Sequence, residues 1–262
     1  MKDFLDLDCF PLEDLGSSER NTLVETCRND LAERGMFNLE GLVRPQALAQ
    51  CLADVIPVRE TSAFTHKRKH NVYFKDHIDG LAPDHPALAT VETINHTVCA
   101  DQIPDSLVCA IYEWPPLAQF LADAMDKPVL HTMPDPLARV NVMAYGHGDA
   151  LNWHFDRSEF TTTLLLQAPE AGGEFQYRSD LRTETDPNYD GVVRLLCGDD
   201  EEIHTLPVIA GTLNVFRGTN TVHRVTPVRG TRERIIAVLS YYEQPGAMFS
   251  AEDRMGFFGR IA

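Results

Sequence analysis

Short segments separated by turn signals fill the second half of the chain, and they constrain the fold more than any other feature. Apolar and polar residues alternate over 139–145, as they do in a strand with one buried face, and turn-forming residues separate this segment from the further short segments. From residue 137 onward we expect eight strands, at 139–145, 151–156, 161–167, 173–177, 192–196, 211–217, 221–225 and 234–242. Eight short strands joined by turns are typical of a barrel or jelly roll, which buries its edges and can hold a small ligand.

The first half of the chain shows the spacing of helices instead. We expect helices at about 17–35, 45–55, within 84–100 and at about 105–125, with Ser17 as the first N-cap and Gly35 as its stop signal. The sequence therefore predicts one α+β domain. In this domain the first part, about 1–136, supplies mainly helical support and the strands that lead into the core. The jelly-roll core follows at about 137–245 and includes a long surface excursion at 178–205. The last residues, 246–262, form a C-terminal tail.

Composition restricts the partners. The net charge of −16 argues against a general affinity for nucleic acid or anionic membranes, since both would repel the chain at long range. The six cysteines form no CxxC pair, which favours reduced thiols over a disulfide framework or a zinc site. No apolar run approaches the roughly 18 residues of a membrane span, and the start is acidic where a secretion signal is basic. We expect a cytoplasmic protein with a small-molecule substrate and no membrane partner, and a homodimer stays open.

A basic run, Lys67-Arg68-Lys69, interrupts this acidic chain within 62–74. One interpretation is a solvated loop in which the charges cluster by chance. The other is a loop that covers the active site and contacts an anionic substrate. The sequence leaves both interpretations open.

Three residues are candidates for the ligands of a metal site. His154 and Asp156 are two positions apart, so in a strand their side chains point the same way, and His223 can reach them from a distant segment. Two imidazoles and one carboxylate on one face of a metal leave three positions open, and this ligand set suits non-haem Fe(II) and oxygen chemistry. Taken without the rest of the chain, His154 and Asp156 could equally form a hydrogen-bonded pair on a surface strand.

The order of the surrounding motifs favours the metal site. Between about 139 and 245 the chain carries Tyr145…Gly148…Trp153-His154-x-Asp156, Gly172-Gly173-Glu174-Phe175, Gly211-Thr212-Leu213-Asn214-Val215-Phe216, His223-x-Val225-Thr226-Pro227-Val228, Gly230-x-Arg232-x-Arg234 and Tyr241-Tyr242. In this order the motifs resemble those of the Fe(II)/2-oxoglutarate-dependent oxygenase superfamily. The resemblance implies a double-stranded β-helix (jelly roll) with a helical layer. It also implies Fe(II) held by His154, Asp156 and His223 as the catalytic triad, 2-oxoglutarate and O2 as cosubstrates, and ascorbate as an activator to be tested.

The cosubstrate needs a partner for its distal carboxylate, because a buried carboxylate is costly unless it is paired, and an arginine is the expected partner. In the superfamily this basic residue lies about ten positions after the distal histidine, at the start of the last core strand. Arg232 and Arg234 flank that spacing, and on a strand both would face the same side. Arg234 fits better, because it aligns 235–242 with the last strand. Asn141 matches an asparagine that contacts 2-oxoglutarate in the alkylated-base demethylases, although Met143 replaces the tyrosine of that pattern.

The resemblance predicts hydroxylation of an unactivated C–H bond, coupled to decarboxylation of 2-oxoglutarate. Asp156 supports hydroxylation, since related halogenases carry a small residue there to admit halide; desaturation and cyclisation stay open. A small anionic metabolite, such as a free or N-acylated amino acid, is the favoured substrate, because several arginines flank the expected pocket: Arg139, Arg157, Arg217, Arg232 and Arg234. The alternatives are a peptide or protein (prolyl-type) hydroxylase and, from another class, a non-catalytic cupin-like barrel that binds a metal or ligand. Nucleic-acid demethylation is disfavoured by the negative charge.

Overall fold

The computed structural model describes all 262 residues, and its strands form two main antiparallel sheets. The larger sheet has seven strands in the order β1-β11-β7-β14-β5-β3-β2, and the smaller has four in the order β10-β9-β12-β6. Two further pairs join β13 to β8 and β15 to β4. The strands are β1 (Met36–Leu39), β2 (Phe64–His70), β3 (Val91–Cys99), β4 (His131–Thr132), β5 (Val140–Tyr145), β6 (Leu151–His154), β7 (Thr161–Gln167), β8 (Ala171–Gly172), β9 (Phe175–Arg178), β10 (His204–Leu206), β11 (Leu213–Phe216), β12 (Val222–Val225), β13 (Val228–Arg229), β14 (Arg234–Leu239) and β15 (Tyr241–Tyr242).

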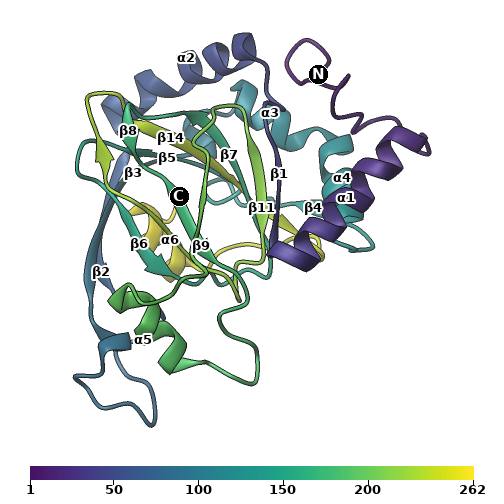
Figure 1. The fold of residues 1–262 in the computed structure, drawn as a ribbon. Coiled ribbons are helices and arrows are strands. Elements are labelled where there is room, and N and C mark those ends of the chain that lie inside the picture. The colour runs from purple at the N-terminus through teal and green to yellow at the C-terminus, as the bar shows by residue number, and fades with distance from the viewer.

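Six α-helices accompany the sheets: α1 (Ser18–Arg34), α2 (Pro45–Ser62), α3 (Leu107–Glu113), α4 (Pro115–Ala124), α5 (Tyr189–Cys197) and α6 (Ala251–Phe258). In Figure 1, α1 to α4 lie along the top and right-hand side of the strands, and α5 lies below them. The α+β class is therefore as predicted. No helix is both long and apolar enough to cross a membrane.

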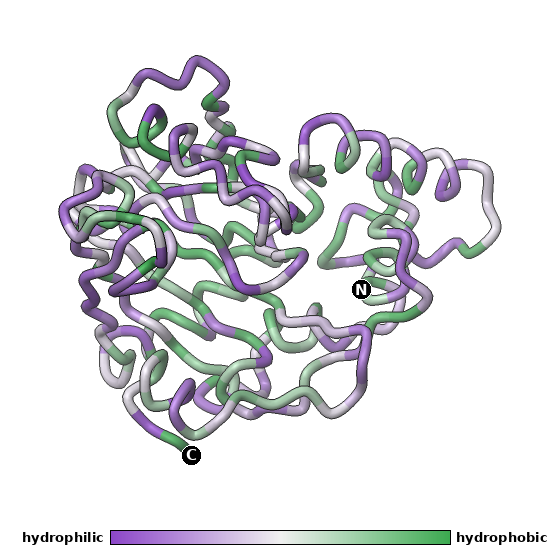
Figure 2. Tube along the Cα trace, turned by 90° about the horizontal axis from the view of Figure 1, so that it is seen from below, coloured by the Kyte–Doolittle hydropathy of each residue, from purple (hydrophilic) through white to green (hydrophobic).

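The main core lies between the seven-stranded sheet and the N-terminal helices. Alternate residues of the central strands point toward the helices and belong to one apolar cluster with helix residues: Val142, Ala144, Leu164, Leu166 and Ala237 with Val55, Ile111 and Phe120. The residues between them, among them Tyr145, Leu165 and Ile236, form a second cluster on the opposite face of the sheet. Figure 2 shows hydrophobic stretches running through the middle of the molecule and hydrophilic stretches frequent in the peripheral segments. Period-two alternation thus gives the large sheet one face for the helices and one for the site.

The predicted helix over 17–35 is confirmed by α1. The side chain of Ser17 accepts a hydrogen bond from the Arg20 N–H at 3.1 Å, and Gly35 ends the helix at a φ of 71°. The predicted helix at about 105–125 is divided into α3 and α4. Pro115 has no N–H to continue the first helix and opens the second one, after Trp114 in an extended conformation.

The prediction of a helix within 84–100 is wrong for most of this segment, because Pro86–Leu88 forms only a short 3-10 helix and Val91–Cys99 forms β3. Thr93, Asn95 and Thr97 are buried on one face, which is the period of a strand. β3 pairs with β2 on one side and β5 on the other. The β-branched residues of the segment crowd a helix but pack well on a sheet, and two neighbouring strands satisfy its backbone.

The prediction of a strand at 192–196 is also wrong, since these residues lie in α5. Asn188 caps this helix: its side chain accepts a hydrogen bond from the Gly191 N–H at 3.0 Å. Val192 and Leu195, three positions apart, are buried and belong to one apolar cluster with Phe155. A five-residue apolar run is compatible with both a strand and a helix, and the cap at Asn188 favours the helix.

The basic run 67–69 lies on strand β2, at the edge of the seven-stranded sheet, and not in a loop. Its side chains alternate. Lys67 and Lys69 are exposed, and Lys67 lies 3.2 Å from the carboxylate of Glu92. Arg68 is less exposed and points into the cavity described below. A strand therefore separates the three positive charges onto two faces.

Candidate metal and cosubstrate site

A cavity of about 620 Å³ lies between the two main sheets. Its walls include residues from β3, β5, β7 and β14 of the larger sheet and from β6, β9 and β12 of the smaller one. Residues 157–160 and α6 contribute to the lining as well. All three candidate metal ligands and Arg234 line this one cavity.

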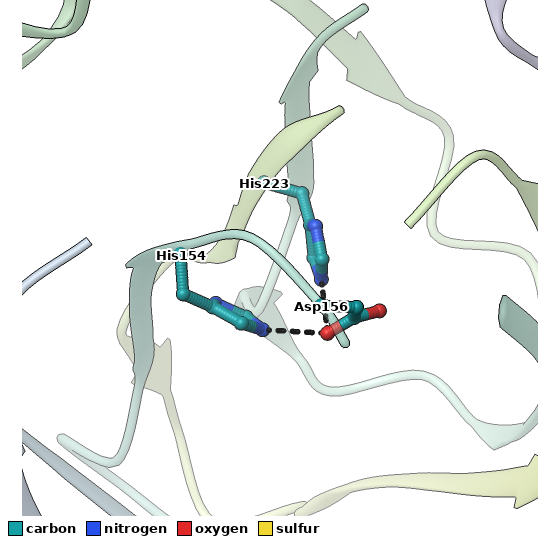
Figure 3. A group of neighbouring side chains, drawn as sticks. All are labelled: His154, Asp156 and His223. Atoms are coloured by element: carbon teal, nitrogen blue, oxygen red, sulfur yellow. Dashed lines mark ion pairs between the residues drawn. The ribbon is translucent and has the colours of Figure 1, made fainter. Parts of the chain in front are cut away.

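The candidate ligands converge from two neighbouring strands. His154 is the last residue of β6, and its backbone lies opposite His223 of β12 in the strand register. Asp156 follows two positions after the end of β6. Its Oδ1 lies 3.3 Å from Nε2 of His154 and 3.7 Å from Nε2 of His223. Figure 3 shows both imidazole rings pointing toward this carboxylate.

Each histidine is fixed by its other ring nitrogen. Nδ1 of His154 lies 2.8 Å from the Asn152 carbonyl oxygen, and Nδ1 of His223 lies 3.1 Å from the Thr221 carbonyl oxygen. A carbonyl can only accept, so each Nδ1 carries a proton and donates it, and in the neutral form of the ring Nε2 keeps its lone pair. This is the tautomer that a metal requires, oriented by a second group as metal-binding histidines commonly are.

Electrostatics favour the metal-binding protonation states of His223 and Asp156. Burial, together with the neighbouring His154, lowers the pKa of His223 to about 4, so it is neutral near pH 7. Burial alone raises the pKa of Asp156, but His223, His154 and the Thr161 hydroxyl outweigh it and hold that pKa well below its usual range. An ionised carboxylate and a neutral imidazole are the protonation states that bind a metal.

The residues fit a metal ion. One donor atom from each of His154, Asp156 and His223 lies within 4.8 Å of the other two, which suits bonds of about 2 Å to a common centre. Apolar rings surround the group: those of Phe175 and Phe216 lie 5.3 and 4.7 Å from the His223 ring. A donor set of two imidazoles and one carboxylate, open on the cavity side, matches a non-haem Fe(II) centre.

Arg234, the first residue of β14, offers a partner for an anion. Its side chain is 3% exposed, Nε donates to the Gly173 carbonyl at 2.9 Å, and Nη1 is buried with no hydrogen-bond partner. Burial lowers the pKa of Arg234 to about 10, which still leaves it positively charged at neutral pH. A buried, unpaired guanidinium N–H fits the distal carboxylate of 2-oxoglutarate.

Gly173 makes room for this arginine. A Cβ at Gly173 would lie 3.1 Å from Cδ of Arg234 and 2.9 Å from Cγ of Pro169, and the backbone has a φ of +61°. Glycine adopts this conformation readily, whereas other residues do so at a cost. The Gly-Gly element found in the sequence therefore supports the arginine that lines the cavity.

The expectation that Arg232 and Arg234 share one face of a strand is wrong. β14 begins at Arg234, so Arg232 precedes the strand. Arg232 is exposed, its Nη2 donates to the Pro169 carbonyl at 3.3 Å, and it does not line the cavity. Asn141, on β5, does line the cavity, and its Nδ2 donates to the Leu137 carbonyl at 2.7 Å.

Phe74 is a wall residue that the sequence did not single out. Its backbone has a φ of 54°, which is unusual for a bulky residue, and its ring lies 5.7 Å from the His154 ring. Asn71 supports the turn: Oδ1 accepts from the N–H groups of Tyr73 and Lys75 at 3.0 and 3.2 Å. An asparagine just after a strand is a turn signal, and it was the one clue in the sequence.

The model of one protein family, described as halogenase D, matches residues 19–251. The chain belongs to the halogenase D family. No curated protein matches the chain. This family match, together with the fold shared with a solved structure of the 2OG-Fe(II) oxygenase family, confirms the superfamily resemblance seen in the sequence.

Three of these structures show how far the common fold extends. An oxidoreductase of the 2OG-Fe(II) oxygenase family from Burkholderia pseudomallei is 14% identical, with 86% of this chain and 92% of that chain covered and a TM-score of 0.52. A Pseudomonas putida prolyl-4-hydroxylase is 14% identical, with 82% and 96% covered and a TM-score of 0.51. The epimerase SnoN from nogalamycin biosynthesis, solved with Fe3+ and alpha-ketoglutarate, is 14% identical, with 84% of each chain covered and a TM-score of 0.56. At 14% identity these likenesses show a common fold.

Proposed function

We propose that this protein is an Fe(II)- and 2-oxoglutarate-dependent dioxygenase that hydroxylates an unactivated C–H bond of a small anionic metabolite, such as a free or N-acylated amino acid. The two main sheets would form the double-stranded β-helix of the superfamily. One observation carries the proposal: the donor atoms of His154, Asp156 and His223 converge in the same cavity as Arg234, whose Nη1 has no hydrogen-bond partner.

The protein groups have separate tasks in this proposal. His154, Asp156 and His223 would hold Fe(II), which when bound supplies the activation of O2 coupled to conversion of 2-oxoglutarate into succinate and CO2. Arg234 would hold the distal carboxylate of the cosubstrate through Nη1. The rings of Phe175 and Phe216 keep water from one side of His223, and Asn141 would contact the cosubstrate from β5.

Asp156 favours hydroxylation over halogenation, although the family is described as halogenase D. A halide ligand needs space where halogenases of this superfamily have a small residue. Here a carboxylate occupies the position, and its Oδ1 lies within 4 Å of Nε2 of both histidines. Desaturation, cyclisation and epimerisation use the same iron site, so they are alternatives that the product would reveal.

An anionic substrate is supported by the charges in the cavity. Lys127 is paired with Glu159 and Glu243, and Arg157 is paired with Asp253. Arg68 forms no ion pair, and its guanidinium lies 4.8 Å from the centre of the Phe74 ring. A cation in a cavity without an acidic partner favours a ligand with a negative group, and we assign Arg68 to the substrate as we assign Arg234 to 2-oxoglutarate.

Two of the arginines expected near the pocket have other partners. Arg139 forms an ion pair with Glu113, and Arg217 lies 3.8 Å from Asp180. Neither of them lines the cavity. Fewer of the expected arginines therefore contribute positive charge to the cavity than the sequence suggested.

A peptide or protein hydroxylase is the second candidate. The fold likeness to prolyl hydroxylases, among them one solved with a peptide fragment, favours it. A cupin-like barrel that only binds is the candidate of another class, and it would form no succinate. The cytoplasmic location and a homodimer stay predictions.

Succinate formation tests the proposal. The protein is incubated with Fe(II), 2-oxoglutarate, ascorbate and O2 in a chloride buffer, with a panel of amino acids and N-acylated amino acids, and succinate and products are measured by mass spectrometry. We expect succinate and a product that has gained one oxygen atom. A product with chlorine in place of hydrogen would overturn hydroxylation. No succinate with any substrate would favour a binding protein, and turnover that survives in both His154→Ala and Asp156→Ala would refute the metal site.

A further inference from the structure

Asp156 lies beyond the end of β6, so the sheet does not orient its carboxylate. Two other contacts do. Its backbone N–H donates to the Gly218 carbonyl at 3.0 Å, and Oδ2 accepts a hydrogen bond from Oγ1 of Thr161 at 2.6 Å. Oδ1 is the oxygen that faces Nε2 of His154 and His223. The two oxygens of one carboxylate therefore have different partners.

Thr161 is well placed to act as a fixed donor. It is the first residue of β7, an interior strand of the seven-stranded sheet, and it lies opposite Phe216 of β11 in the register. Residues 157–160 connect it to Asp156, and the Gly218 N–H donates to the Glu159 carbonyl at 2.8 Å across this connection. The sheet thus holds the hydroxyl independently of the ligand that it contacts.

Gly218 shows how closely these groups pack. A Cβ at this position would lie 2.8 Å from Cβ of Asp156, 2.8 Å from Oγ1 of Thr161 and 2.7 Å from the Ser158 carbonyl oxygen. Those distances are shorter than a side chain tolerates without a shift of its neighbours. The glycine therefore lets the carboxylate, the hydroxyl and the backbone of 156–161 approach each other.

We propose that Thr161 is a positioning residue that keeps Asp156 a one-oxygen ligand of Fe(II), an inference that rests on the proposed function. The hydroxyl can donate one hydrogen bond, and it donates to Oδ2. A carboxylate that binds through both oxygens would take one of the positions that 2-oxoglutarate and O2 need. Hydrogen bonds to ionised acceptors are strong, and such outer groups orient metal ligands in many proteins.

Two variants separate the hydroxyl from the shape of the side chain. Thr161→Val keeps the shape and removes the donor, and Thr161→Ser keeps the donor. We measure the Fe(II) dissociation constant by anaerobic titration and the visible spectrum of the Co(II)-substituted protein, which reports the coordination number. We expect Thr161→Val to bind Fe(II) about 10- to 100-fold more weakly and to change the Co(II) spectrum, with Thr161→Ser within about threefold of wild type and spectrally unchanged. Thermal unfolding of the metal-free proteins verifies that each variant is folded.

Thr161→Val with wild-type Fe(II) affinity and an unchanged Co(II) spectrum would overturn the positioning role of Thr161. Equal losses in Thr161→Val and Thr161→Ser would also overturn it, because the hydroxyl would then not be the decisive group. If Thr161→Val does not fold, Thr161→Ala is measured against Thr161→Ser in the same way. Wild-type protein that binds no Fe(II) would instead refute the proposed function, and is recognised before any variant is compared.

Discussion

Replacement of Arg234 by methionine removes a positive charge from a buried position where the structure shows no acidic partner for it. The side chain is 3% exposed, Nε is held by the Gly173 carbonyl at 2.9 Å, and Nη1 is free to bind a carboxylate. Loss of one member of a buried, hydrogen-bonded charge pair costs about 2–5 kcal/mol. At about 1.4 kcal/mol per factor of ten, the middle of that range predicts 2-oxoglutarate binding about 300-fold weaker in Arg234→Met. Arg234→Lys keeps the charge but loses the planar fork, and we expect it to fall between methionine and wild type.

Calorimetric titration of 2-oxoglutarate into the anaerobic Fe(II) protein measures this difference. Arg232→Met is the matched control, because Arg232 lies two positions away, is exposed, and its side chain donates to the Pro169 carbonyl at 3.3 Å outside the cavity. We expect the control to stay within about twofold of wild type, as exposed charges contribute little. Comparable affinities of Arg234→Met and wild type, or a larger loss in Arg232→Met, would refute the assignment of the cosubstrate pocket.

Three further predictions concern the metal and the backbone around the site. His223→Ala should weaken Fe(II) binding by at least about 100-fold, since one of three protein ligands is lost, and equilibrium dialysis against wild type measures it; unchanged iron content would contradict the triad. Asn71→Ala should lower the free energy of unfolding by about 2 kcal/mol, because the N–H groups of Tyr73 and Lys75 lose their acceptor; an unchanged urea midpoint would show that the turn does not depend on Asn71. Gly173→Ala should lower the free energy of unfolding by about 1–3 kcal/mol, since the φ of Gly173 is +61° and the new Cβ would meet Pro169. The same urea titration measures this loss, and equal stability of variant and wild type would mean that the turn adapts without strain.

Local signals in the sequence were sufficient for several elements. Ser17 and Gly35 delimit α1, and short segments between turn signals located most strands after residue 137. The signals failed where one pattern suits two structures. The apolar run at 192–196 is helical because Asn188 caps it, and β3 is a strand because β2 and β5 pair with it. Asn188 lies only four positions before this run, so it is a local signal that the strand prediction missed, whereas β2 and β5 lie outside the window of residues that forms β3.

The sequence by itself determined which residue types were available to the site: His154, Asp156 and His223 in order, and an arginine about ten positions later. The tertiary structure decided how they are used. The register of β6 with β12 brings His223 to His154, and the start of β14 at Arg234 leaves Arg232 outside the cavity. The tertiary structure also places Thr161 against Asp156 and Phe74 against His154, and these contacts are not indicated by any motif. A motif fixes which atoms are present, whereas directions and distances depend on where separate strands begin and how they pair.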